Sequence, residues 1–188
     1  MRTISIIGCG VIGSSLAVKL VKFNLCKVIC LYDYDFVSPV KVRFPFYKEQ
    51  GGMLKVEALK SILQFESEFK YSIICYPIRV IKQFSSKKSC NLIIDCRDDK
   101  RKSIGASFSV SLEGNSLVLD NRKNIKIDIN NRYTIVPSLK NIDIATNLVA
   151  DYIRFEIYKT NNDLFLIDLK TISGFINEGK DVWFRKQC

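Results

Sequence analysis

The feature that most constrains this chain is a glycine-rich turn near its N-terminus, between a short apolar run and a helical one. The turn contains Gly8, Gly10 and Gly13 in the spacing G-x-G-x-x-G. In this spacing the first glycine makes a tight turn, the second lets backbone approach a phosphate, and the third allows close helix–strand packing. We expect a helix over residues 12–23, whose free N–H groups would point toward that phosphate.

An acidic side chain follows the next predicted strand. Residues 27–32 are apolar after the first position, as expected of a parallel strand covered on both faces. Asp33 comes directly afterwards and Asp35 two residues later. A carboxylate at this place can accept hydrogen bonds from ribose hydroxyls. The glycines alone would also suit a purely structural turn, but strand, turn, helix, strand and acid together predict a nucleotide-binding β-α-β unit.

The rest of the chain continues the alternation of strands and helices. We predict helices over residues 55–65, 100–112 and 141–158, strands over 71–76, 90–96 and 116–119, and a hairpin over 125–136. These elements define an α/β class with a Rossmann-like, doubly wound, mainly parallel sheet. We expect one nucleotide-binding domain over residues 1–160 and a short C-terminal appendage over residues 161–188.

Composition narrows the chemistry and the partners. The net charge is +10, which suits either a solvated lysine-rich surface or attraction to a polyanion or an acidic protein partner. The basic residues are spread along the chain without an aromatic-interleaved motif, so we do not expect nucleic-acid binding. There is no histidine, which excludes His-based triads and most catalytic zinc sites. Seven cysteines without a C-x-x-C pair predict reduced thiols in a cytoplasmic protein, with no zinc. We find no secretory or membrane-spanning segment.

Several charged side chains follow the predicted strands. Besides Asp33 and Asp35, they are Arg43 in the next loop, Lys55 at a helix start and Asp98 after the fourth strand. Ligands of open parallel sheets bind outside the carboxyl ends of the strands, so we expect these groups to converge there. A dehydrogenase would need only the glycine turn and the ribose acid.

In order and spacing, these motifs resemble the ThiF/MoeB/ubiquitin-activating family of adenylating enzymes. The resemblance covers roughly the first 115 residues. Its pieces are the glycine turn, Asp-Tyr-Asp-Phe-Val at 33–37, an arginine before Phe-Pro-Phe-Tyr at 44–47, Lys-Val-Glu-Ala at 55–58 and Asp-Cys-Arg-Asp-Asp at 95–99.

The resemblance implies that the chain binds ATP with Mg²⁺ and activates a carboxyl terminus. The substrate would be a small ubiquitin-like protein, a sulfur-carrier protein or a peptide, and the enzyme a homodimer or a heterodimer with a related chain. The three glycines would line the nucleotide, and Asp33 or Asp35 would hold the ribose. Arg43 and Lys55 would clamp the phosphates, and Asp98 would hold magnesium. Fixed cations and a metal stabilise the developing negative charge without a proton relay.

Other interpretations stay open at this point. The family's Asn-x-x-Arg element reads Ser-Pro-Val-Lys-Val-Arg-Phe at 38–44, and its Asp-Asn pair reads Asp98-Asp99. These departures favour a binding or scaffold protein that kept the fold and lost catalysis. An NAD-dependent oxidoreductase is a third hypothesis. Cys96 could be a thioester nucleophile, but neighbouring acids disfavour its thiolate, so we expect a buried structural cysteine.

Overall fold

The structure is a computed structural model of the chain. It describes residues 3–43, 45–68, 70–81, 92–98, 104–113, 116–120, 125–128, 139–157, 165–167 and 182–184. The helices are α1 (Val11–Lys22), α2 (Lys55–Glu66) and α3 (Leu139–Ile157), with a short 3-10 helix at Lys48–Gln50. The strands are β1 (Thr3–Ile7), β2 (Val28–Tyr32), β3 (Ser72–Tyr76), β4 (Leu92–Asp95), β5 (Phe108–Glu113), β6 (Ser116–Asp120), β7 (Ile125–Asp128), β8 (Phe165–Ile167) and β9 (Val182–Phe184).

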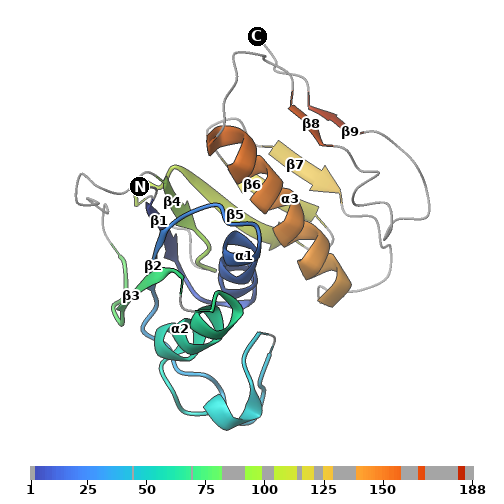
Figure 1. Ribbon diagram of the computed structural model, residues 1–188. Coiled ribbons are helices and arrows are strands. Elements are labelled where there is room, and N and C mark those ends of the chain that lie inside the picture. Colours follow the sequence, from blue (N-terminus) through green and yellow to red (C-terminus); the bar gives the residue numbers. More distant parts are fainter. Residues whose placement is uncertain are drawn as a thin grey trace.

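Seven strands form one twisted sheet in the order β3-β2-β1-β4-β5-β6-β7 (Figure 1). Strands β3, β2, β1, β4 and β5 are parallel, whereas β6 and β7 are antiparallel to their neighbours. From β1 the chain adds β2 and β3 on one side of the sheet, and it then crosses to the other side of β1 to form β4. The strand order therefore reverses at β1. A crevice for ligands opens at such a reversal of strand order, outside the carboxyl ends of the strands. The predicted Rossmann-like, mainly parallel α/β fold is confirmed.

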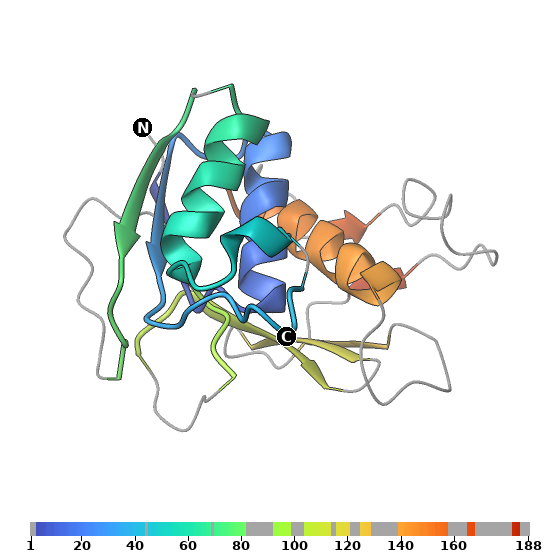
Figure 2. The ribbon, with the colours of Figure 1, turned by 90° about the horizontal axis from the view of Figure 1, so that it is seen from below.

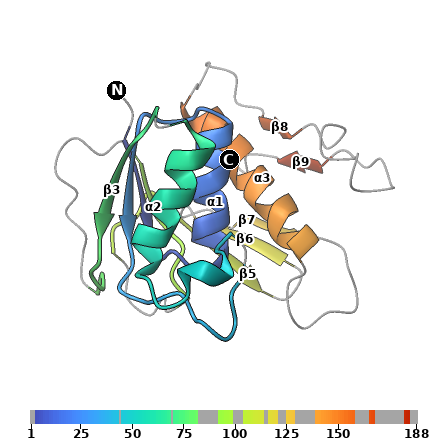
Figure 3. The same cartoon turned by 60° about the horizontal axis from the view of Figure 1, so that its bottom comes forward.

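Helices α1, α2 and α3 cover the same face of the sheet, with α1 between the other two (Figures 2 and 3). Because α1 contacts the sheet and both neighbouring helices, it is buried almost all round. Its side chains form the main core with the helix-facing residues of the strands, among them Ile4 and Ile6 of β1 and Ile29 and Leu31 of β2. This core holds β1 and β2 rigidly, and with them the turn and the acid that follow.

A smaller apolar cluster lies on the other face of the sheet. Its strand residues alternate with those of the main core, as the two-residue period of a strand requires: Ile7 of β1, Cys30 and Tyr32 of β2, and Ile93 of β4. Val80, in the segment after β3, packs into the same cluster. The segment after β3 is therefore held against this face of the sheet, close to its carboxyl edge.

One predicted element is wrong. We expected a helix over residues 100–112, but residues 108–113 are strand β5, which pairs with β4 and β6. The sequence Phe-Ser-Val-Ser-Leu-Glu alternates apolar and polar residues, which is the strand period, and Val110 is buried. Glu113 pairs with Ser116, so β5 and the antiparallel β6 are adjacent in the sequence as well as in the sheet. Residues 99–103 lie outside the described part of the chain.

The remaining elements agree with the predicted ones to within a few residues. Helix α3 begins at Leu139, two residues before the predicted start. Of the hairpin expected over residues 125–136, only β7 belongs to the described residues, and it pairs with β6. In the predicted appendage, β8 and β9 form a separate two-stranded sheet (Figure 1). None of the described helices is long and apolar enough to span a bilayer.

Candidate functional site

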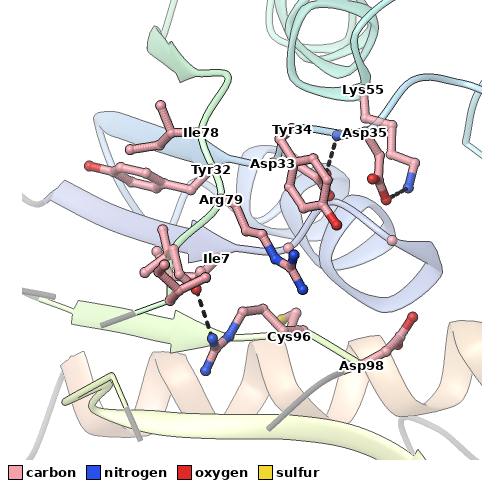
Figure 4. Close-up of a pocket in the computed structure, with 15 residues that line it drawn as sticks. Ile7, Tyr32, Asp33, Tyr34, Asp35, Lys55, Ile78, Arg79, Cys96 and Asp98 are labelled. Atoms are coloured by element: carbon pink, nitrogen blue, oxygen red, sulfur yellow. Dashed lines mark hydrogen bonds and ion pairs between the residues drawn. The ribbon is translucent and has the colours of Figure 1, made fainter. Parts of the chain in front are cut away.

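A cavity of about 540 Å³ opens at the carboxyl edge of the sheet, at the reversal of strand order (Figure 4). Its walls come from the segments that follow β1, β2, β3 and β4, together with the first residue of α2. The volume lies within the range of small-molecule sites. The sheet therefore gathers side chains that are far apart in the sequence around one opening.

Gly8 and Gly10 of the glycine turn line this cavity, whereas Gly13 lies outside its lining. Gly8 has a φ of +92°, and a Cβ there would press on the backbone of Cys96. A Cβ on Gly13 would overlap the carbonyl oxygen of Gly8, so α1 can pack this closely on the turn only with glycine. Gly10 caps α1 without a side-chain hydrogen bond, and no acid lies in the first turn. The first N–H groups of a helix lack intrahelical partners, so this end of α1 suits an anion.

Asp33 fastens the glycine turn to the end of β2. The residue is 8% exposed, and each carboxylate oxygen accepts a backbone N–H: Oδ2 from Cys9 at 2.6 Å and Oδ1 from Asp35 at 2.8 Å. Burial, and after it the charge of Asp33, raises the pKa of the Cys9 thiol well above its ordinary value. Cys9 is therefore an inert thiol, and Asp33 fixes the shape of the turn.

Lys55 and Asp35 form an ion pair at the mouth of the cavity. Lys55 Nζ lies 2.8 Å from Asp35 Oδ2, and the pair joins the segment after β2 to the start of α2 (Figure 4). Partial burial lowers the pKa of Lys55, but the hydrogen bond to Asp35 and the charges of Asp33 and Asp35 outweigh it. The pKa of Lys55 is raised as a result. The ammonium group stays charged at neutral pH.

Arg97, which we did not single out from the sequence, joins two walls of the cavity. Its guanidinium donates to both carboxylate oxygens of Asp95 at 2.9 Å and to the carbonyl oxygen of Val80 at 2.8 Å. This fork anchors the segment after β3 to the end of β4. The Asp-Cys-Arg-Asp-Asp motif was noted for its acids, and only tertiary contacts show what its arginine does.

Arg79 is a second arginine that sequence reasoning missed. It lies three residues after β3 in the sequence Pro-Ile-Arg-Val-Ile, and its guanidinium lies 5.4 Å from the centre of the Tyr34 ring. Figure 4 shows Arg79 extending into the cavity between Tyr34 and Cys96. The sequence signal is the same as for Asp33 and Asp98, because Arg79 is a charged residue shortly after the end of a strand, here β3.

The structure brings most of the predicted site residues to this cavity. Asp98 lies on the β4 side and is exposed, while Cys96 is buried but also contributes to the lining. Arg43 is exposed in the loop between β2 and α2 and does not line the cavity. Among the described residues, no group of three or more cysteine or acidic side chains is arranged to hold a metal. The predicted residues that line the cavity are Gly8, Gly10, Asp33, Asp35, Lys55 and Asp98.

The sheet order and the cavity at its carboxyl edge define a Rossmann-like α/β protein. Among solved structures, the fold is similar to that of MccB from E. coli. The structure of MccB with succinimide has a TM-score of 0.62 and 15% identity over 88% of this chain and 60% of MccB. The structure with ATP has a TM-score of 0.62 and 16% identity, covering 88% and 59% of the two chains. The structure with SeMet MccA has a TM-score of 0.60 and 14% identity, with the same coverage.

This likeness establishes the fold that the sequence motifs implied. The chain spans about 60% of the length of MccB. No protein-family model and no curated protein matches the sequence.

Proposed function

We propose that this chain binds ATP at the carboxyl edge of its sheet and adenylates a carboxyl terminus of a peptide or small protein. The observation that carries the proposal is the convergence of the glycine turn, Asp33 and Lys55 on one cavity. The fold is shared with MccB, of which structures with ATP and with MccA are known. The motif resemblance to adenylating enzymes supports the same chemistry.

The residues present suit a nucleotide. A Cβ built on Gly10 would meet nothing within 4 Å, so the backbone there is open to an approaching phosphate. The uncapped end of α1 offers N–H donors to the same region. Each oxygen of Asp33 accepts one N–H and keeps a lone pair that can accept from a ribose hydroxyl. Lys55 adds a positive charge at the mouth.

The proposed reaction joins a carboxylate oxygen of the substrate to the α-phosphorus of ATP and breaks the bond to pyrophosphate, which leaves. Negative charge builds up on the phosphoryl oxygens, where the end of α1 and Lys55 would stabilise it. Magnesium, when bound, would neutralise part of the phosphate charge. Magnesium commonly takes only one or two protein carboxylates together with phosphates, and we expect Asp98, which belongs to the cavity lining, to provide one.

The sharpest test uses Gly10→Ala, because we expect the variant to keep the fold. Gly10 has a φ of −69° and its Cβ would point into open space, so we expect less than about 1 kcal/mol of destabilisation. The added methyl would, however, occupy the space needed for close phosphate approach. In calorimetric titration with ATP and Mg²⁺ we expect wild-type binding and a loss of about tenfold or more in the variant. Equal binding by both proteins, or none by the wild type, would contradict the proposal.

Catalysis is tested separately by exchange of labelled pyrophosphate into ATP. We expect exchange when a peptide ending in Gly-Gly with a free carboxylate is supplied, and none with the same peptide amidated at its C-terminus. Exchange with both peptides would show that the terminal carboxylate is not the attacking group.

A non-catalytic binding protein is the second candidate, and one observation favours it. Arg43, which the resemblance assigns to the phosphates, is exposed and lies outside the cavity lining, and Lys55 is engaged by Asp35. A protein of this kind could retain the fold and a ligand site without promoting phosphoryl transfer. ATP binding without exchange across a panel of free-carboxylate peptides would favour this candidate.

A further inference from the structure

The cavity has a positive group that its own acids do not engage. Among the described residues of the lining there are three basic side chains, Lys55, Arg79 and Arg97, and three acidic ones, Asp33, Asp35 and Asp98. Lys55 is paired with Asp35, and Arg97 with Asp95. No carboxylate in the described part of the chain lies within ion-pair distance of Arg79, whose side chain is exposed to the cavity.

The backbone that carries Arg79 is held in place although the side chain is free to meet a ligand. The next residue, Val80, is buried in the smaller apolar cluster, and its carbonyl oxygen accepts the hydrogen bond from Arg97. The Tyr34 ring lies against the guanidinium and directs it inward (Figure 4). A planar, permanently charged fork on a fixed segment is well suited to phosphate or carboxylate oxygens, because little freedom is lost on binding.

We propose that Arg79 is the residue that binds an anionic oxygen of the ligand in this cavity, in the role that the motif resemblance assigns to Arg43. The inference rests on the proposed function. Without Arg79 the described lining would carry more negative than positive groups, which would oppose a phosphate. The anion is a nucleotide phosphate or the substrate carboxylate, because a guanidinium can bind a pair of oxygens of either group with two parallel hydrogen bonds.

The test compares adenosine with AMP, because the two differ only in the phosphate. Binding of each is measured by calorimetry for the wild type, Arg79→Gln and the control Lys48→Gln, which removes one positive charge from an exposed residue outside the lining. We expect Arg79→Gln to weaken AMP by about 10- to 100-fold and to leave adenosine unchanged. Lys48→Gln should change neither ligand. Arg79→Lys, which keeps the charge, should recover part of the lost AMP affinity.

The outcomes separate the alternatives. An equal loss for adenosine and AMP would overturn the inference and indicate that Arg79 stacks on the base together with Tyr34. If AMP binding is unchanged but Arg79→Gln raises the KM of a free-carboxylate peptide in pyrophosphate exchange, the anion is the substrate carboxylate. If neither AMP binding nor that KM changes, the inference is wrong while the proposed function stands. Absence of ATP and AMP binding by the wild type would overturn both.

Discussion

Replacing Asp33 with alanine tests whether this carboxylate holds the glycine turn in place. Asp33 is buried, and its carboxylate accepts two backbone N–H groups, from Cys9 at 2.6 Å and from Asp35 at 2.8 Å. Hydrogen bonds to a charged group contribute about 1.5–3 kcal/mol each, and the Cys9 N–H would be left buried without its acceptor. Because water can reach the Asp35 N–H more easily, we expect a total loss of about 3–5 kcal/mol.

The loss is measured by urea unfolding followed by circular dichroism. With a slope of about 2 kcal/mol per molar urea, the midpoint should fall by about 2 M. The matched control is Asp35→Ala, two residues away, whose side chain is 47% exposed and whose one ion pair among the described residues is with Lys55. Its removal should cost no more than about 0.5 kcal/mol. If both variants shift the midpoint equally, or if Asp33→Ala shifts it by less than about 0.5 M, Asp33 does not fasten the turn.

Three further predictions follow from contacts in and under the site. Gly13→Ala should destabilise the fold by about 2–3 kcal/mol despite the better helix propensity of alanine, because its Cβ would overlap the carbonyl oxygen of Gly8; wild-type stability in thermal unfolding would contradict this packing. Arg97→Gln should cost about 3 kcal/mol in urea unfolding, since it leaves the buried Asp95 charge without its partner, and a loss below 1 kcal/mol would count against that role. Folding raises the pKa of Lys55, so its stabilising contribution is complete below the unfolded-state value of about 10.4 and is lost as the pH rises through the folded-state value. The difference in unfolding free energy between the wild type and Lys55→Gln should therefore be constant from about pH 7 to 9 and shrink above about pH 11; a difference that grows there would refute the assignment.

The first half of the fold could be predicted because its signals are local. Each local pattern predicts the conformation of its own segment: the glycine spacing predicts a turn, the apolar run predicts β2, and the helical spacing of apolar residues predicts α2. The acid after β2 and the lysine at the start of α2 fall at strand and helix ends, where a parallel sheet gathers functional groups. These residues line the cavity, as the pattern indicates.

The second half was harder to predict because its strands form pairs that the sequence does not specify. Residues 108–113 carry a strand alternation that competes with a helical interpretation, and pairing with β4 and β6 decides between them. In the first half, Arg43 belongs to one of the motifs that carry the resemblance, but the loop between β2 and α2 leaves it exposed and outside the cavity lining. Membership of a motif does not determine where a loop side chain lies.

The sequence alone determined the β-α-β unit and the location of the site at the carboxyl edge of the sheet. Both depend on signals within a few residues, namely the steric demands of the glycines and the positions at which strands end. Gly8 is required by its positive φ, and Gly13 by the carbonyl oxygen of Gly8 five residues earlier in the chain. Only the tertiary structure decided that Asp33 is committed to the turn, that Arg97 ties the segment after β3 to β4, and that Arg79 reaches the cavity. The physical reason is that hydrogen bonds and ion pairs between strands depend on the order of strands in the sheet. That order brings residues 33, 79 and 97 around one opening although they follow three different strands of the chain.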